Sequence, residues 1–253
     1  MSARFTGKVA LVTGGGTGIG RATALALARE GATVVVAGRT ESALADTVAL
    51  VEKEGGTASL ALADVTREHD VERLVGTVVA RHGGLHVAVN NAGAFAPATP
   101  LADLDTEVFR RMLDVNLVGV FLSMKHEIRH MRAHGGGAIV NLGSNIGAHV
   151  RRPGLSAYAT AKGALSVLTR AAALDHIGDG IRITALSAGS NEGPMSARPG
   201  ETDAERAARI GTQVPLGRLG SLDEVTSAVL WLASDDAGFA VGTDLVLDGG
   251  ASA

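Results

Sequence analysis

The chain has 253 residues, 46% hydrophobic and 19% charged, so it can bury one substantial core, and we expect a single domain over residues 1–253. Its net charge is −3 and its basic residues are scattered, which argues against a nucleic-acid or membrane partner. The absence of cysteine excludes disulfides, a catalytic thiol and thiolate metal sites. We find no H-x-x-x-H spacing in a helix that also offers a nearby carboxylate ligand set, so we expect no metal. The N-terminus does not resemble a signal peptide and no apolar run approaches the ~18 residues of a spanning helix, which favours a cytoplasmic protein.

Short apolar runs alternate with longer segments of helical periodicity along the chain. Seven runs predict strands, namely Val9–Thr13, Thr33–Ala37, Thr57–Ala63, Leu85–Val89, Ala138–Leu142, Ile181–Leu186 and Asp244–Leu247. The segments between them predict helices over 18–30, 41–54, 67–82, 104–133, 157–178 and 221–233, with a shorter one near 203–210. Most of the strands are apolar throughout, as expected when both faces are buried. The order predicts a doubly wound, Rossmann-like α/β fold with a seven-stranded parallel sheet and helices on both faces.

The first predicted strand is followed by TGGGTGIG, residues 13–20. The dinucleotide fingerprint G-x-G-x-x-G cannot be placed there, because Ile19, Arg21 or Thr23 occupies its last position. The stretch nevertheless joins a strand to a helix, at the edge where open parallel sheets bind their ligands. Backbone N–H groups and a helix N-terminus at that edge suit a pyrophosphate. A glycine-rich turn without a ligand is the less favoured alternative.

The second predicted strand ends in VVVAGRT. NAD-selective proteins usually carry an acidic residue there to bind the ribose 2′-hydroxyl, whereas an arginine accommodates a 2′-phosphate. Gly38 stands at the acidic position, and Arg39 and Thr40 follow it. For the nicotinamide cofactor that the family resemblance described below implies, these residues predict a preference for NADP(H), with NAD(H) as the alternative. A solvated loop arginine is the alternative interpretation of Arg39.

Tyr158 and Lys162 lie one turn apart on a predicted helix, so their side chains share a face. An ammonium beside a phenol favours the phenolate and lowers a pKa that is ordinarily about 10. Tyr158, the only tyrosine, could then exchange a proton with an alcohol or a forming alkoxide near neutral pH. The alternatives are a packed aromatic ring with a bonded hydroxyl and a solvated lysine.

Six motifs in register resemble those of the short-chain dehydrogenase/reductase family over essentially the whole chain. They are Thr13-Gly14-x3-Gly18-x-Gly20, Asp64-Val65, Asn90-Asn91-Ala92-Gly93, Ser144, Tyr158-x3-Lys162 and the ending PLGRLGSLDEVTSAVLWLASDDAGFAVGTDLVLDGG. The resemblance implies an oxidoreductase that transfers a hydride, without a metal, between a nicotinamide cofactor and a carbonyl or secondary alcohol. It also implies a homotetramer, with the helices over 104–133 and 157–178 in contact between subunits.

The resemblance implies two sets of site residues. In the catalytic set of Asn116, Ser144, Tyr158 and Lys162, Ser144 bonds the substrate oxygen, and Asn116 kinks its helix and positions water for a proton relay. From the residues alone, a turn serine and a locally bonded helix asparagine would be the ordinary interpretations of these two. The cofactor-binding set contains Gly14, Thr17, Gly18, Ile19, Gly20, Arg39, Thr40, Asp64, Val65, Asn90, Ala92, Gly93, Tyr158, Lys162, Gly189 and Asn191.

The sequence departs from the family pattern in two places. Ser144 and Tyr158 are 14 residues apart, about one more than is usual in the family, which predicts an insertion in the loop between them. Gly193 stands where the family has the threonine that bonds the nicotinamide carboxamide, and Ser190, Ser196 or backbone groups are the replacements. We expect a weaker hold on the cofactor or greater loop mobility, and predict a mobile substrate loop over about 188–212.

The substrate is the least determined part of the interpretation. We expect the pocket wall to come from Ala94, Phe95, 145–155 and 189–195, and the substrate to be a small carbonyl or alcohol. Arg151 and Arg152 could attract an anionic substrate or an acyl carrier, although adjacent loop arginines are more often solvated. A ketoacyl-thioester reductase, a sugar dehydrogenase and a secondary-alcohol dehydrogenase all stay open.

Two further classes are weighed against an oxidoreductase. Epimerases and dehydratases that share Tyr-x-x-x-Lys use G-x-x-G-x-x-G, which is absent. A non-catalytic NADP(H)-binding regulatory or scaffold protein of the same fold is the alternative function, and it would be expected to lose a member of the catalytic set. All four positions are filled, which favours an enzyme.

Overall fold

One parallel sheet organises the computed structural model, which describes residues 3–198 and 200–253. Its seven strands lie in the order β3-β2-β1-β4-β5-β6-β7, and every adjacent pair is parallel. Their bounds are β1 Val9–Thr13, β2 Thr33–Gly38, β3 Thr57–Leu62, β4 Val87–Asn90, β5 Gly137–Leu142, β6 Ile181–Ala188 and β7 Asp244–Leu247. The predicted doubly wound fold is confirmed, with strand ends shifted by at most two residues.

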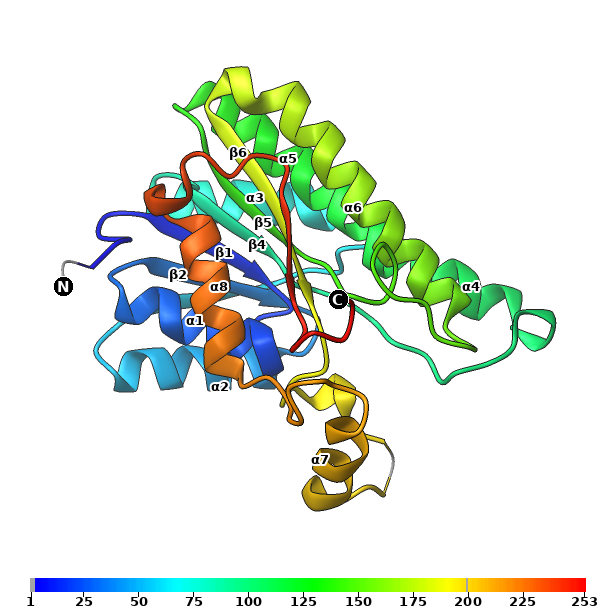
Figure 1. Cartoon of the computed structure of the whole chain (residues 1–253). Helices are drawn as coiled ribbons and strands as arrows, with labels where there is room; N and C mark the ends of the chain where they lie inside the picture. Colours follow the sequence, from blue (N-terminus) through cyan, green and yellow to red (C-terminus); the bar gives the residue numbers. More distant parts are fainter. Residues whose placement is uncertain (1–2, 199) are drawn as a thin grey trace.

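Helices cover both faces of the sheet (Figure 1). Helices α1 (Gly18–Arg29), α2 (Glu41–Lys53) and α8 (Leu222–Ala233) pack on one face. Helices α3 (Glu68–His82), α5 (Gly119–Ala133) and α6 (Ser156–His176) pack on the other. Helix α4 (Thr106–Leu113) precedes α5, and α7 (Asp203–Gly211) projects from the rest of the fold at the bottom of Figure 1.

The uninterrupted apolar pattern of the strands follows from this sandwich. In β1, Ala10 and Val12 face the core under α1 and α8, while Val9 and Leu11 face the core under α3, α5 and α6. Successive strand residues point to opposite faces, so a strand between two helical layers needs apolar residues at every position. Burial of each large side chain stabilises the fold by about 1.5–3 kcal/mol.

The predicted helix over 104–133 is interrupted. Between α4 and α5 lies a π-helical segment, Asp114–Val118, with Asn116 at its centre. The Asn116 side chain donates to the carbonyl of Met112, four residues earlier, and so competes for an acceptor that regular α-helix would use. The backbone stays helical from Thr106 to Ala133, so the predicted helix is present and the π-helical segment is a local change of winding at Asn116.

The strand order reverses beside β1, whose neighbours are β2 and β4. In an open parallel sheet, ligands bind beyond the carboxyl ends of the strands at such a switch point. The loops that follow β1, β4, β5 and β6 therefore converge on one region of the molecule. Within the described ranges 3–198 and 200–253, no helix is long and apolar enough to cross a membrane.

Candidate active site

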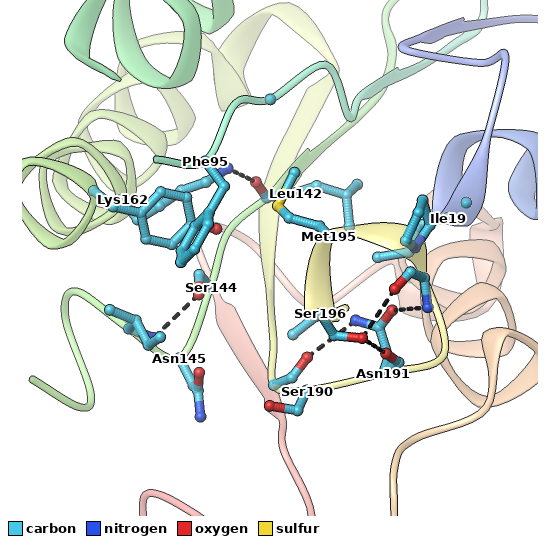
Figure 2. A pocket seen from close by; sticks show the side chains of 18 of the residues that line it. Ile19, Phe95, Leu142, Ser144, Asn145, Lys162, Ser190, Asn191, Met195 and Ser196 are labelled. Atoms are coloured by element: carbon cyan, nitrogen blue, oxygen red, sulfur yellow. Dashed lines mark hydrogen bonds between the residues drawn. The ribbon is translucent and has the colours of Figure 1, made fainter. Parts of the chain in front are cut away.

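A cavity of about 710 Å³ lies at the carboxyl ends of the strands, a size typical of ligand pockets. Figure 2 shows Ser144, Lys162 and Phe95 on one side of it, and Ile19, Asn191 and Ser196 on the other. The predicted site residues that line it are Gly14, Thr17, Gly18, Ile19, Ala92, Gly93, Asn116, Ser144, Tyr158, Lys162, Gly189 and Asn191. Six others, Gly20, Arg39, Thr40, Asp64, Val65 and Asn90, are not among the lining residues.

The glycine-rich loop is shaped by close backbone packing. A Cβ on Gly20 would lie 2.2 Å from the carbonyl oxygen of Gly14 and 2.5 Å from Nδ2 of Asn91. Gly14 has φ +65°, and the Asn91 amide donates to the carbonyls of Thr13 and Gly14. The loop therefore requires glycine at both positions, and Asn91 holds it against the end of β4. Asn91, absent from the predicted site set, was part of the quoted Asn90-Asn91-Ala92-Gly93 motif.

The N-terminus of α1 opens on this loop. Thr17 occupies the N-cap without a side-chain bond to the helix, and no acidic residue stands in the first turn. The first backbone N–H groups are left without that capping partner, and the helix end carries a partial positive charge. The arrangement fits a diphosphate, which takes both the hydrogen bonds and the charge. Pro194 approaches from the opposite side and would be 2.9 Å from a Cβ on Gly18.

The ends of β2 and β3 lie beside the cavity and carry charged side chains. Arg39 is exposed at the end of β2, close enough to Asp64 to lower the pKa of that carboxyl. Burial acts to raise the pKa of Asp64, but hydrogen bonds from Thr66 and the charges of Arg39 and Arg67 outweigh it. Thr66 donates to Asp64 through both its backbone N–H and its hydroxyl. Arg39 is thus an exposed charge at the end of β2, next to the Asp64 carboxyl.

The side chain of Asn90 belongs to the core. Its amide donates to Glu127 and to the side-chain oxygen of Asn141, each at 3.0 Å. Asn141 in turn donates to Thr169 at 3.0 Å. All four side chains are buried, and burial raises the pKa of Glu127 to about 7 in spite of the Asn90 bond. The Asn90 side chain therefore braces β4 and β5 against α5, and its predicted contact with the cofactor stays a prediction.

The four predicted catalytic side chains converge in the cavity and are nearly excluded from solvent. Their exposed fractions are 0% for Asn116, 7% for Ser144, 8% for Tyr158 and 5% for Lys162. Lys162 Nζ donates to the carbonyl of Leu142 at 2.6 Å and lies 6.0 Å from the centroid of the Tyr158 ring. Phe95 packs edge-on against that ring, with centroids 5.1 Å apart. The grouping brings a phenol, a hydroxyl and an ammonium to one end of the cavity.

The predicted lowering of the Tyr158 pKa is wrong for this structure. Burial raises the pKa of Tyr158, and the hydrogen bond with Ser144 offsets only part of that. Burial also lowers the pKa of Lys162 to about 8. The two directions share a cause, because a dry site penalises the charged form of both groups. Helical spacing predicts that Tyr158 and Lys162 lie close together, but it does not show that both are buried or that the ammonium bonds the Leu142 carbonyl.

Asn116 ties the π-helical segment to the loop after β4. Its side chain accepts from the N–H of Ala94 at 3.1 Å and donates to the carbonyl of the same residue at 3.0 Å. Gly93 lies directly under it, because a Cβ on Gly93 would be 3.1 Å from the Asn116 oxygen. The predicted helix irregularity at Asn116 is therefore present, and it fixes the wall next to Phe95.

The loop after β5 is anchored to β7. Asn145 donates to Asp248 at 3.1 Å, and His149 Nε2 lies 3.0 Å from a carboxylate oxygen of Asp244. The same Asp244 oxygen accepts from Ser166, one turn beyond Lys162, at 2.6 Å. Asp244 thus joins this loop to the helix that carries Tyr158 and Lys162. Neither aspartate was predicted: Asp244 begins β7, and Asp248 follows its end.

The segment after β6 closes the far side of the cavity. Asn191 accepts from the N–H of Gly193 at 2.9 Å, and the Ser196 hydroxyl donates to the carbonyl of Asn191 at 2.7 Å. The Ser196 hydroxyl is thus already bonded, so Ser190, which lines the cavity, is the better placed of the two serines predicted to replace the threonine. Helix α7 adds the lining residues Arg209 and Ile210, and the turn after it adds Gln213, none of which was among the predicted site residues. In the part of the chain that the structure describes, no three metal-ligating side chains gather into a group that could hold a metal ion.

Comparison with known proteins agrees with this geometry. A family model described as enoyl-(acyl carrier protein) reductase matches residues 14–252. Cis-4-hydroxycyclohexanecarboxylate dehydrogenase of Sinomonas cyclohexanicum is 42% identical over 100% of both chains. Cyclohexanol dehydrogenase of Acinetobacter sp. (strain SE19) is 40% identical, over 98% of this chain and 96% of its own.

Solved structures lead to the same family. A short-chain type dehydrogenase/reductase from Mycobacterium marinum superposes with a TM-score of 0.93 at 35% identity, over 99% of this chain and 98% of its own. The resemblance carried by the six sequence motifs is thereby confirmed. The chain belongs to the short-chain dehydrogenase/reductase family of oxidoreductases.

Proposed function

We propose that the chain is an NADP(H)-dependent dehydrogenase/reductase that interconverts a secondary alcohol on a small ring and the corresponding ketone. The observation that carries the proposal is the single cavity that joins the uncapped N-terminus of α1 to the buried group of Ser144, Tyr158 and Lys162. The N-terminus of α1 fits the diphosphate of a dinucleotide. The polar groups at the other end fit the oxygen of a carbonyl substrate.

Arg39 supports the choice of NADP(H). It is exposed at the end of β2, and its charge reaches the neighbouring Asp64. A 2′-phosphate beside it would gain a charge-assisted bond, whereas a 2′-hydroxyl would gain little. The residues that would hold the rest of the cofactor are the predicted lining set from Gly14 to Gly93 with Gly189 and Asn191. When bound, the nicotinamide supplies or accepts the hydride.

Tyr158 exchanges the proton of the reaction. As a carbonyl carbon gains a hydride, the phenol gives its proton to the carbonyl oxygen, and in the opposite direction it takes the proton of the alcohol. Ser144, which already bonds Tyr158, holds the same oxygen. Burial raises the pKa of Tyr158 and so favours the protonated phenol, whereas a nearby positive charge favours the phenolate. Lys162, with its pKa lowered to about 8 by burial, supplies such charge and passes protons to and from Tyr158.

The relatives support a ring alcohol as the substrate. The names of two relatives at 42% and 40% identity, cis-4-hydroxycyclohexanecarboxylate dehydrogenase and cyclohexanol dehydrogenase, refer to hydroxyl groups on six-membered rings. Around the catalytic group the cavity wall contains Phe95, Ala96, Pro97, Ala98 and Leu155, an apolar surface suited to a saturated ring. This favours a secondary-alcohol dehydrogenase over a sugar dehydrogenase.

We further propose that the chain forms a homotetramer. Helices α5 and α6 expose Phe121, Val167 and Leu174, and the region from α8 to β7 exposes Trp231 and Phe239. Two separate apolar patches support two self-complementary interfaces, and two such interfaces generate a closed tetramer. Light scattering after gel filtration tests this, and a monomer at micromolar concentration would contradict it.

The proposed function is tested by titration and turnover. NADPH and NADH are titrated against the protein by fluorescence, and cyclohexanol, cyclohexanone and open-chain analogues are then assayed with the better cofactor. We expect tighter binding of NADPH and turnover of the ring substrates. Binding without turnover of any alcohol or ketone would favour the alternative, a non-catalytic NADP(H)-binding protein.

A further inference from the structure

The charge of the cavity lining is one-sided. Among its lining residues in the described ranges, four are basic, namely Arg152, Lys162, Arg198 and Arg209, and none is acidic. Lys162 belongs to the catalytic group, and its ammonium donates a hydrogen bond to the Leu142 carbonyl. The three arginines lie on the loop after β5 and on the segment from β6 to α7, away from the glycine loop in sequence. Their charge therefore needs an explanation of its own.

Two of these arginines share a carboxylate. Arg209 donates to both oxygens of Glu201, at 2.5 and 2.7 Å, and also to the carbonyl of Ser196. The charge of Arg198 acts on the same Glu201, whose pKa is lowered to about 2, chiefly by the Arg209 hydrogen bonds. Arg198 also donates its backbone N–H to Glu201. The Glu201 carboxylate thus offsets one of the two guanidinium charges at this end of α7, and it lies close to both.

Arg152 differs from both. Its partner is a neutral amide, because Nη1 donates to the side-chain oxygen of Gln213 at 2.8 Å. Within residues 3–198 and 200–253, Arg152 forms no ion pair. A guanidinium carries five donors, so one bond to Gln213 leaves most of them for another acceptor. Arg152 is half-buried in the cavity wall, where an unbalanced charge is felt more strongly than in bulk water.

The backbone under Arg152 is held in place. Residues 152–155 form a turn in which the N–H of Leu155 donates to the carbonyl of Arg152, Pro153 occupies the second position, and Gly154 the third with φ +77°. Proline and a positive-φ glycine at these positions are the pattern of a type II turn. The carbonyl of Gly154 accepts from Thr99 at 2.9 Å, which ties the turn to the loop after β4. The turn leads into α6 two residues before Tyr158, so it presents Arg152 at a fixed place near the reacting end.

We infer that Arg152 is a specificity-determining residue that binds a carboxylate on the substrate. A planar guanidinium with free donors matches a carboxylate, and the apolar residues that line the same cavity as Arg152 and Tyr158 suit the ring that carries both groups. This inference rests on the proposed function, because it assigns the second polar group of the same ring alcohol. Arg151, the neighbouring arginine, is exposed, is not among the lining residues and donates to the carbonyls of Ala148 and His149. It serves as a matched control.

The test compares two substrates that differ by one carboxylate. Turnover of cis-4-hydroxycyclohexanecarboxylate and cyclohexanol is measured with NADP⁺, and the ratio of their kcat/KM values is the readout. We expect Arg152→Gln to lower that ratio by about tenfold to a hundredfold, as for loss of hydrogen bonds to a charged group. Gln213→Glu, which places a carboxylate beside the guanidinium, lowers it in the same direction. Arg152→Lys keeps part of the preference, and Arg151→Gln keeps all of it.

Gln213→Ala separates charge recognition from a structural link between the loop and α7. It breaks the link and leaves the guanidinium, so the preference for the carboxylate should persist. If Arg152→Gln and Gln213→Ala slowed both substrates equally, Arg152 would act as a structural contact and the inference would be overturned.

A binding measurement tests the carboxylate site separately from the proposed reaction. Cyclohexanecarboxylate has no alcohol to oxidise, and its affinity for the NADP⁺ complex is measured by calorimetry. We expect Arg152→Gln to weaken it about tenfold or more and Arg151→Gln to leave it as in the wild type. Absence of turnover with intact, Arg152-dependent binding would count against the proposed reaction alone. Equal affinity in the wild type and Arg152→Gln would count against the carboxylate site alone.

Discussion

At one end of the cavity the lining is mostly main chain, whereas at the other it is side chains carried by the segments that follow β4, β5 and β6. The glycine end consists of Gly14, Thr17 and Gly18, packed so closely on the end of β4 that a Cβ on Gly20 would overlap a carbonyl. The substrate end consists of residues such as Phe95, Arg152 and Met195, which extend from loops anchored elsewhere. Backbone geometry restricts which residue types the first end accepts, while the second end can change its side chains without changing the fold.

The two ends also differ in what stabilises them. Beneath the glycine end lies the buried network of Asn90, Glu127 and Asn141, continuous with the sheet. The substrate end is held by single side-chain bonds, such as that of His149 to Asp244 and that of Arg152 to Gln213. We therefore expect changes at the glycine end to affect folding and cofactor binding, and changes at the substrate end to affect turnover and selectivity.

The largest effect is expected where the ends meet, at Tyr158. Replacement by phenylalanine keeps the ring that packs on Phe95 and removes the hydroxyl, so the proton has no donor. We expect kcat to fall by roughly 10²- to 10⁴-fold with little change in cofactor affinity. Steady-state turnover and fluorescence titration of the same preparation measure both. Full turnover by Tyr158→Phe would remove the proposed acid and base.

Glu127→Gln tests the support beneath the glycine end. Burial raises the pKa of Glu127 from 4.5 to about 7, so the folded state binds its proton more tightly than the unfolded chain does. The resulting stability is fully present below pH 4.5 and is lost as the pH rises through about 7, by on the order of 3 kcal/mol. Glutamine does not titrate, so the variant should gain stability relative to the wild type across this window.

Urea unfolding at several pH values measures the effect. Glu52→Gln, at an exposed position on α2, is the control and should follow the wild type. Parallel pH profiles for Glu127→Gln and the wild type would show that Glu127 is not a buried titrating group.

Gly20→Ala tests whether the glycine end depends on backbone packing. A methyl group there would lie 2.2 Å from a carbonyl oxygen, so we expect a loss of about 1–3 kcal/mol in the free energy of unfolding, and weaker cofactor binding. The matched control is Gly76→Ala in α3, where nothing lies within 4 Å of the new methyl group. There the better helix propensity of alanine should stabilise the protein by up to about 1 kcal/mol. Equal responses of the two variants would refute the packing argument.

The smallest effect is expected at Arg39, which lies outside the cavity lining. We expect Arg39→Ala to weaken NADPH binding about tenfold and to alter NADH binding far less, because a single charge-assisted bond is removed. Arg29→Ala, which removes an exposed ion pair with Glu54 on the far part of α1, controls for loss of surface charge. Parallel losses for both cofactors in Arg39→Ala would remove the basis for NADP(H) selectivity.

The contrast between the ends explains how much could be predicted from sequence. The parallel sheet, the glycine loop and the convergence of Ser144, Tyr158 and Lys162 were predictable, because each depends on residue types that few alternatives can replace. The core hydrogen bonds of Asn90 could not be predicted, since its motif position does not reveal the buried Glu127 that it bonds. The lining role of Gln213 was missed, because it depends on how α7 folds back over the cavity.

The central claim is that one cavity carries hydride transfer between NADP(H) and a ring carbonyl. The most direct measurement uses NADPH carrying deuterium at either of the two nicotinamide C4 positions, with 4-oxocyclohexanecarboxylate as substrate and mass spectrometry of the product. The account predicts that one of the two labelled cofactors delivers a single deuterium to the ring carbon that bears the new hydroxyl. An unlabelled alcohol from both cofactors, or no alcohol at all, would contradict it.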